Sequence, residues 1–374
     1  MSARQLAIID VKAGVAMESQ SGLQASRPRI YGAYEEPAQG KKRIAAIVMH
    51  PSSNFMGHYL ISPLAQRGIC CMGLNSRYMG NDSVLIMERV IQDLGAGIRF
   101  LRGLGYELIL LLGNSGGGAL AAFYQAQAEN LTLTGTPAGD PVELTASDLP
   151  PADGIMLNAA HAGRAALLRE WIDPSVRDES ESLDADPALD MYAPENGPPY
   201  SNSFLRRFRD AQAQRVKRIE FWVRERLSIL RGSPQGPSDQ AFIIHRTHAD
   251  PRFLDLSLDA NDRAAGSIWG DARAVNYGAN AMGRYTSCTA FLSQWSSVSN
   301  ADGPENLART SVPVLFLEHT ADGSTFPSTR TAWLTAAGNR ATALQVKNGT
   351  HYLNGQPKLV EFIAENIADW AVSI

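Results

Sequence analysis

The chain has 374 residues, of which 44% are hydrophobic and 19% are charged, and its formal net charge is −4. This length accommodates two or three average domains, or one large α/β domain with an insertion, and the composition is that of an ordinary globular protein. The small negative charge gives no electrostatic basis for binding nucleic acid or an anionic membrane, so we expect neither as a partner.

The cysteines and the N-terminal segment indicate the compartment. Cys70 and Cys71 are adjacent in an apolar run and Cys288 stands alone, a pattern that predicts neither a disulfide framework nor a zinc cluster. The first ten residues lack the apolar segment of a signal peptide, and no run approaches the length of a membrane span. We therefore expect a cytoplasmic protein.

The N-terminal part of the chain predicts strands. Residues 4–17 alternate loosely and are typical of an edge strand, and the polar run 18–27 predicts a turn or loop. Residues 29–34 and 43–49 are separated by a linker with proline and glycine, which favours a hairpin-like pair. The second member is apolar enough to lie in the centre of a sheet.

Strands and helices then alternate along the chain. Apolar spacing predicts a helix over residues 54–67, a buried strand over 69–74, and a helix over 84–101 with Asp82 as its N-cap. Another buried strand covers 108–112. This alternation predicts a mostly parallel, doubly wound sheet joined by right-handed crossovers.

The regular alternation is interrupted in the middle of the chain. A polar loop over 132–151 leads into a strand over 154–160, after which residues 161–311 show no strand–helix alternation. The alternation then resumes: we predict strands over residues 312–318 and 342–346, each followed by a helix, over residues 327–337 and 357–372 respectively. The most economical organisation is an α/β core, residues 1–160 and 312–374, with an inserted, mainly helical cap, residues 161–311.

One helix of the cap is rich in arginine. Over residues 202–231, acidic residues are interleaved with the arginines and apolar residues recur at helical spacing. This pattern predicts a solvated helix that packs an apolar stripe on the core. An arginine that binds a substrate carboxylate is the alternative interpretation.

A Gly-x-Ser-x-Gly sequence lies between the strand at 108–112 and a helical pattern at 119–128. In a tight strand-to-helix turn the apical Ser115 takes a strained conformation, and side chains on its neighbours would clash. The turn exposes the Ser115 hydroxyl and leaves the Gly116 N–H free at the start of a helix. A glycine-rich turn that holds a phosphate and performs no chemistry is the alternative.

A serine hydroxyl needs a base and an orienting acid to become a nucleophile. His351 follows the last predicted strand, and Asp322 follows the strand before it, so both belong at the carboxyl edge of the sheet beside Ser115. The order serine, aspartate, histidine is the one expected for this type of fold. Glu318 is the alternative acid, and His319 beside it is expected to be a spectator.

These three motifs resemble those of the α/β-hydrolase superfamily. Gly113-Asn114-Ser115-Gly116-Gly117 resembles its nucleophile elbow, the segment from Val314 to Asp322 its acid-bearing strand end, and Gly349-Thr350-His351 its histidine loop. The resemblance covers residues 29–160 and 312–372 and leaves the cap unmatched. It implies a serine hydrolase with Ser115, Asp322 and His351 as catalytic residues, and it identifies no subfamily.

The loop after the third strand departs from the pattern of this superfamily. Relatives usually carry His-Gly there, whereas this chain has His50-Pro51-Ser52-Ser53. Because Pro51 has no N–H to donate, the N–H groups of Gly116 and Ser52 are the expected oxyanion-hole pair, with Ser53 as a fallback. We expect His50 to hold this loop in place.

The substrate pocket is the least defined part of the prediction. Ser53, His161, Trp269 and Tyr285 are candidate lining residues, although the aromatic residues are equally consistent with a core of the cap. His245 and His248, with Asp250 and Asp255 nearby, match no compact zinc motif and are assigned to a polar cap loop. We expect no metal and no cofactor.

The expected activity is hydrolysis of an ester or lactone bond in a medium-sized organic molecule, through an acyl-enzyme on Ser115. Two alternatives remain open at this point. One is a hydrolase that cleaves a carbon–carbon bond of a diketone-like substrate with the same three residues, and the other is a non-catalytic binding member of the fold. The expected partner is a small-molecule substrate, and the sequence leaves open whether the chain forms a homo-oligomer.

Overall fold

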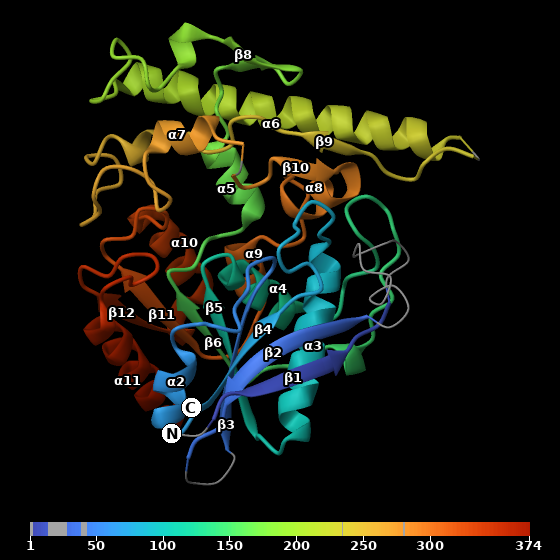
Figure 1. Cartoon of the computed structure of the whole chain (residues 1–374), viewed down its shortest axis with the longest axis vertical. Coiled ribbons are helices and arrows are strands. Elements are labelled where there is room, and N and C mark those ends of the chain that lie inside the picture. Colours follow the sequence, from blue (N-terminus) through green and yellow to red (C-terminus); the bar gives the residue numbers. More distant parts are fainter. Residues whose placement is uncertain (1–2, 14–27, 39–42, 234, 280) are drawn as a thin grey trace.

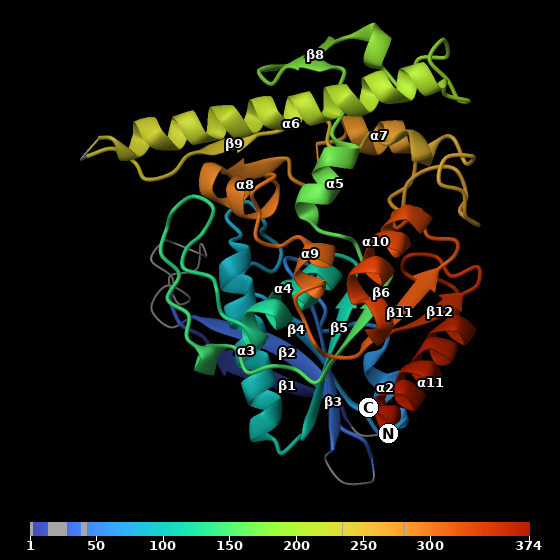
Figure 2. The same ribbon diagram turned by 180° about the vertical axis from the view of Figure 1, so that it is seen from behind.

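The computed structural model describes residues 3–13, 28–38, 43–233, 235–279 and 281–374. A central sheet is flanked by helices, and a second layer that contains one long helix lies across one end of it (Figures 1 and 2). The turn predicted at residues 18–27 lies outside the described residues.

The sheet has eight strands in the order β1-β2-β4-β3-β5-β6-β11-β12. Neighbouring strands from β4 to β12 are parallel, whereas β1 and β2 pair antiparallel with their neighbours. The strands are β1 (Gln5–Asp10), β2 (Arg29–Glu35), β3 (Ile44–His50), β4 (Cys70–Asn75), β5 (Leu108–Asn114), β6 (Gly154–Asn158), β11 (Val314–His319) and β12 (Ala341–Val346). The predicted α/β class with a mostly parallel, doubly wound sheet is confirmed.

The hairpin expected between residues 29–34 and 43–49 is wrong. β2 pairs with β1 and β4, and β3 lies between β4 and β5. Residues Ile44 to Met49 of β3 are all buried, so this strand needs a partner on both edges and cover on both faces. A linker with proline and glycine predicts a turn of the chain, but it does not predict which strands become neighbours in the sheet.

Helices cover both faces of the sheet, and successive residues of one strand show the division. Ala45, Ile47 and Met49 of β3 pack in a core cluster with α3, α4, α9 and α10, whereas Ile44, Ala46 and Val48 pack in another with α2 and α11. These helices are α2 (Ile61–Gln66), α3 (Met87–Gly103), α4 (Gly117–Glu129), α9 (Gly303–Leu307), α10 (Pro327–Ala337) and α11 (Pro357–Ser373).

Two helices start later than their sequence patterns predict. α2 covers only Ile61–Gln66 of the predicted 54–67, because the Asn54 side chain bonds to the Met56 N–H and the Asn75 side chain instead of starting a helix. Asp82 does not cap α3, whose N-cap is Ile86. The Asp82 carboxylate instead pairs with an arginine of the cap, Arg164.

The segment between β6 and β11 forms a layer of helices and two small sheets. It contains the helices α5 (Arg164–Trp171), α6 (Asn202–Arg231), α7 (Ala272–Tyr277) and α8 (Cys288–Gln294), and the strands β7 (Val176–Asp178), β8 (Glu181–Ala185), β9 (Ala241–Ile243) and β10 (Tyr285–Ser287). α5 connects the sheet to the layer that contains α6 (Figure 1). The end of the segment returns to the core, where α9 packs beside α4 and the Gly303 N–H donates to the Ala162 carbonyl.

Short 3₁₀ turns complete the described structure. They are η1 (Ala146–Asp148), η2 (Pro187–Leu189), η3 (Pro251–Phe253) and η4 (Gly338–Arg340).

The predicted arginine-rich helix coincides with α6. Ser201 caps its N-terminus by accepting the Phe204 N–H, and an apolar stripe from Phe204 to Leu230 is buried. Arg215 departs from the expected solvated face, because it is fully buried and donates to Glu179 and to main-chain carbonyls. Its guanidinium therefore stabilises the cap.

Within the described chain, no helix combines the length and the apolar character that a bilayer crossing requires.

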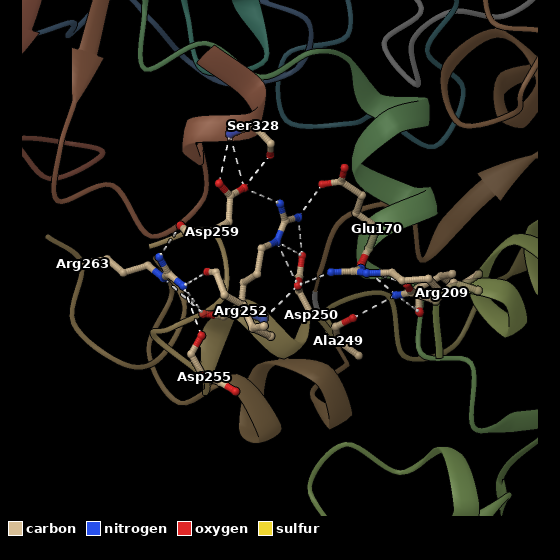
Figure 3. Close-up of polar contacts among 12 residues, drawn as sticks. Glu170, Arg209, Ala249, Asp250, Arg252, Asp255, Asp259, Arg263 and Ser328 are labelled. Atoms are coloured by element: carbon tan, nitrogen blue, oxygen red, sulfur yellow. Dashed lines mark hydrogen bonds and ion pairs between the residues drawn. The ribbon is translucent and has the colours of Figure 1, made fainter. Parts of the chain in front are cut away.

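A network of charged residues joins the cap to the core (Figure 3). The buried Asp250 carboxylate accepts hydrogen bonds from Arg209 of α6 and from Arg252, which also contacts Glu170 of α5. Further along the same loop, Asp259 accepts the N–H and hydroxyl of Ser328 at the start of α10, and the Arg263 side chain donates to four main-chain carbonyls of the loop. The network thus links α5, α6 and the core helix α10.

Asp250 is the residue on which we expect this network to depend. Burial alone would raise the pKa of its carboxyl, but Arg252 and Arg209 lower that pKa to about 2. The folded state therefore gains stability from the ionised carboxylate above the ordinary pKa of 3.8, and loses it as the pH falls toward about 2.

We predict that Asp250→Asn lowers the free energy of unfolding by about 3 kcal/mol at neutral pH, because the buried Arg252 and the partly buried Arg209 lose their charged partner. Urea unfolding measures this change. Glu305→Gln, in the exposed Glu305–Arg309 pair, is the control and should change stability by less than about 0.5 kcal/mol. The difference in free energy of unfolding between wild type and Asp250→Asn should become smaller as the pH falls below about 4. A difference that becomes larger would contradict the stabilising role of the ionised Asp250 carboxylate.

Candidate active site

Ser115 lies in a strained turn between β5 and α4. Its φ is 55°, in the left-handed region, and its main chain is held by neighbouring segments. The Ser115 N–H donates to the Asn158 carbonyl at 3.2 Å, and its own carbonyl accepts the N–H of His161 and of Gly118, each at 3.0 Å. The strain is thus maintained by β6 and the residues that follow it.

The glycines around Ser115 permit main chains to approach closely. A Cβ at Gly117 would lie 2.4 Å from the Met49 carbonyl oxygen, and one at Gly118 would lie 2.5 Å from the Ala160 Cβ. A Cβ at Gly113 would lie 2.7 Å from the Cα of Gly118. The predicted reason for glycine at this turn, that side chains would clash, agrees with these distances.

The structure brings Ser115, His351 and Asp322 into one hydrogen-bonded row. The His351 Nε2 lies 3.0 Å from the Ser115 Oγ, and its Nδ1 lies 2.7 Å from the Asp322 Oδ2. The His351 and Asp322 side chains are almost completely buried. The carboxyl ends of β5, β11 and β12 supply the three residues, as the sequence predicts.

The Asp322 carboxylate is surrounded by hydrogen-bond donors. Its Oδ1 accepts the N–H groups of Ser324 and Thr325 and the Ser324 hydroxyl, and its Oδ2 accepts the Thr325 hydroxyl in addition to the His351 contact. Burial by itself would raise the pKa of Asp322, but His351 and the Thr325 hydrogen bond hold it well below its usual range. The carboxylate therefore stays ionised and fixes the orientation of His351.

The alternative acid and its histidine neighbour have other partners. The Glu318 carboxylate pairs with Arg330 and accepts the Gln345 side-chain amide. His319 uses both ring nitrogens in hydrogen bonds, to the Asn158 side chain and to a main-chain carbonyl. Neither residue competes with Asp322 for His351.

The loop after β3 differs from the expected arrangement. The Ser52 and Ser53 N–H groups both point at the His50 Nδ1, at 3.2 and 2.9 Å. His50 therefore holds this loop, as predicted, but the Ser52 N–H and its fallback, that of Ser53, are already engaged. The Gly116 N–H, in contrast, has no acceptor among the described residues.

A cavity of about 710 Å³ lies over Ser115. Its lining includes the predicted residues Ser52, Gly116, Ser53, His161 and Trp269. The His161 ring centroid lies 5.3 Å from that of His351, and burial together with His351 lowers the pKa of His161 to about 3. A neutral imidazole, that of His161, thus lies beside the ring of His351.

Sequence reasoning missed Arg164 in this cavity. Its guanidinium donates to the Ser52 Oγ at 2.6 Å and to Asp82 at 3.0 Å, and lies 4.9 Å from the centroid of the Trp295 ring. The sequence did contain a signal for Arg164. It is a charged residue that follows the carboxyl end of β6 shortly, and this end of β6 lies at the sheet edge that carries Ser115. Other lining residues were also missed, among them Leu167, Trp171, Met282 and Tyr352.

Other predicted candidates lie away from Ser115. Tyr285 is in β10 with an exposed side chain and is absent from the lining of the cavity, which corrects its assignment as a pocket residue. His248 is buried and stacks on Phe253 and Trp269. No group of three or more metal-ligating side chains gathers in the described ranges.

Comparisons with known proteins support the fold. No family model matches the chain, and no curated protein matches its sequence. The solved structure of DcsB with its substrate analogue aligns at TM-score 0.52 and 11% identity over 99% of both chains. A hypothetical protein from Pseudomonas aeruginosa aligns at TM-score 0.51 and 12% identity, over 100% of this chain and 94% of that chain. An esterase domain from Rhodothermus marinus aligns at TM-score 0.47 and 12% identity over 98% of both chains.

We predict that Gly117→Ala lowers the free energy of unfolding by about 2 kcal/mol, because its Cβ would meet a main-chain carbonyl that cannot rotate away. Denaturant unfolding followed by tryptophan fluorescence measures the change. The control is Gly103→Ala at the end of α3, where a Cβ meets nothing within 4 Å. Gly103→Ala should leave the free energy of unfolding unchanged or raise it by up to about 1 kcal/mol. Equal losses of stability in both variants would contradict the argument that Gly117 permits a close approach of main chains.

Proposed function

The chain has the α/β-hydrolase fold, and we propose that it is a serine hydrolase that cleaves an ester or lactone bond through an acyl-enzyme on Ser115. The supporting observation is the row in which the Ser115 Oγ lies 3.0 Å from the His351 Nε2, while the His351 Nδ1 lies 2.7 Å from a buried, ionised Asp322. A serine, a base in reach of its hydroxyl and an acid that orients the base form the arrangement that acyl transfer requires.

In the first half of the reaction, the Ser115 Oγ attacks the substrate carbonyl while His351 accepts the hydroxyl proton at Nε2. Asp322 keeps the His351 Nδ1 protonated and stabilises the imidazolium that forms. The tetrahedral intermediate collapses when the bond to the leaving oxygen breaks and His351 passes the proton to that oxygen. The products of this half are an alcohol and an acyl-enzyme; for a lactone the alcohol remains attached to the acyl group.

Water completes the cycle. His351 takes a proton from a water molecule, whose oxygen attacks the acyl carbon, and the bond to the Ser115 Oγ then breaks as His351 returns the proton to it. The carboxylic acid leaves and the starting state is restored. Neither half requires a group beyond the chain, the substrate and water.

The cavity supports the proposed size and character of the substrate. A volume of about 710 Å³ lies within the range typical of small-molecule sites. Leu167, Trp171 and Met282 supply apolar walls, and Arg164 lies at the same cavity with partners already in place. These features support a medium-sized, largely apolar acyl or alkyl group.

We predict that a panel of chromogenic short- and medium-chain esters is turned over by the wild type and that Ser115→Ala abolishes this turnover. A fluorophosphonate should label the wild type at Ser115, as located by peptide mass spectrometry, and should leave the variant unlabelled. Labelling without ester turnover would favour the carbon–carbon bond hydrolase. Wild-type protein that shows neither turnover nor labelling would overturn both enzyme assignments.

A comparison of Asp322 with Glu318, which lies four positions before it in the sequence, separates the role of Asp322 from a general charge effect. Asp322→Asn should lower kcat about 10³- to 10⁴-fold, because His351 then loses the partner that fixes its tautomer. Glu318→Gln is the matched control and should retain kcat within about threefold, since its carboxylate pairs with Arg330 instead. Steady-state kinetics on the same ester measures both variants, and the reverse ranking would assign the acid to Glu318.

A further inference from the structure

We propose that the side chain of His50 is a catalytic residue: its Nε2–H and the Gly116 N–H together form the oxyanion hole. The inference rests on the proposed function, because it assigns a role in the same acyl-transfer reaction. It replaces the Ser52 N–H as the second donor.

The protonation pattern of the His50 ring follows from its neighbours. The Nδ1 accepts two main-chain N–H groups, those of Ser52 and Ser53. A ring nitrogen that accepts hydrogen bonds carries no proton, and a neutral imidazole carries one proton in total. The proton of His50 therefore resides on Nε2, which makes this atom a donor.

The surroundings of His50 keep the ring neutral. Burial is the largest influence, and Arg164, His161 and His351 add to it, so that the pKa of His50 is well below its usual value. The donor on Nε2 and the acceptor on Nδ1 therefore coexist at neutral pH. A neutral imidazole can polarise a carbonyl without giving up its proton.

The His50 Nε2 lies close to Gly116, the residue that carries the other donor. A Cβ built on Gly116 would be 2.7 Å from it, so the imidazole edge lies against the main chain that follows Ser115. His50, Ser115 and Gly116 all line the cavity. No described residue accepts a hydrogen bond from the His50 Nε2 or from the Gly116 N–H, so both donors remain available for one substrate oxygen.

The main chain of the loop is committed elsewhere. Pro51 has no N–H, and its carbonyl accepts the Ser76 hydroxyl at 2.5 Å. The Ser52 carbonyl accepts the Gly80 N–H at 2.8 Å, and the Ser52 hydroxyl is held by Arg164. These contacts fix the loop, and the loop fixes the ring through Nδ1. The donor is thus preorganised, which is the property that makes an oxyanion hole effective.

The two ring nitrogens can be tested separately. In His50→Gln, the side-chain amide reaches the position of Nε2 and can restore the donor, but nothing replaces the Nδ1 acceptor. In His50→Asn, the shorter amide reaches the position of Nδ1 and can accept the loop N–H groups, but no donor remains at Nε2. A purely structural His50 would be rescued by asparagine, and a catalytic His50 by glutamine.

We expect His50→Asn to lower kcat on an ester substrate about 10²- to 10³-fold with little change in KM, because the donor acts mainly on the transition state. His50→Gln should retain kcat within about tenfold of wild type. A trifluoromethyl ketone, whose adduct with Ser115 carries an oxyanion, should bind more weakly to His50→Asn by the same factor as the loss in kcat/KM. Thermal unfolding identifies a variant that does not fold, and the remaining variant then decides.

Retention of wild-type kcat in His50→Asn would overturn the proposal, as would a larger loss in His50→Gln than in His50→Asn. Tyr59 also lines the cavity, so a hundredfold loss in Tyr59→Phe with unchanged His50→Asn would assign the donor to Tyr59. The failure of the proposed function looks different, because wild-type protein would then be neither labelled by a fluorophosphonate nor active on esters.

Discussion

The geometry of the site depends on the close approach of main chains around Ser115. Gly117 and Gly118 let the carboxyl end of β3 and the residues after β6 come within distances that a Cβ would not allow. The Asn158 carbonyl accepts the Ser115 N–H, and the Ser115 carbonyl accepts the His161 N–H, so the residue with positive φ is held on both sides. The energy of the strained turn is therefore offset by the packed sheet. As a result, the serine hydroxyl is attached to a turn whose main chain is hydrogen-bonded to neighbouring segments, which favours chemistry that requires accurate placement.

Two clusters around buried carboxylates, those of Asp322 and Asp250, also stabilise the site. Both clusters contact the short segment from Asp322 to the start of α10. Asp322 is ionised because His351, Ser324 and Thr325 surround it with donors. Asp250 is ionised because Arg209 and Arg252 contact it, and the loop that carries it continues to Asp259, which binds the start of α10. α10 begins a few residues after Asp322. An unpaired buried charge is costly, so each cluster tolerates little displacement. The cap and the acid that orients His351 are consequently anchored to neighbouring parts of the same chain segment.

Local patterns predicted well wherever the structure is decided by neighbours in sequence. The long helix α6 and the helices α10 and α11 follow from apolar spacing and from caps such as Ser201. The pattern was misleading at residues 54–67, where side chains of Asn54 and Asn75 take the hydrogen bonds of the main chain. It also misled for β2 and β3, which are close in sequence but separated in the sheet by β4. In the cap, the sequence pattern does not distinguish the aromatic residues Trp269 and Tyr285, yet only Trp269 lines the cavity.

The sequence by itself determined the strand–turn–helix at Ser115 and the placement of Asp322 and His351 at the same sheet edge, because each depends on the local order of strands, glycines and loops. Tertiary structure decided what those edges contact. His50 illustrates the difference: its position after β3 is evident from the sequence, but the proton on its Nε2 follows only from the direction of two main-chain N–H groups toward Nδ1. The entry of Arg164 into the cavity was likewise set by partners far along the chain, Asp82 and Gln294. Hydrogen-bond direction and burial arise from packing between distant segments, and no local pattern records them.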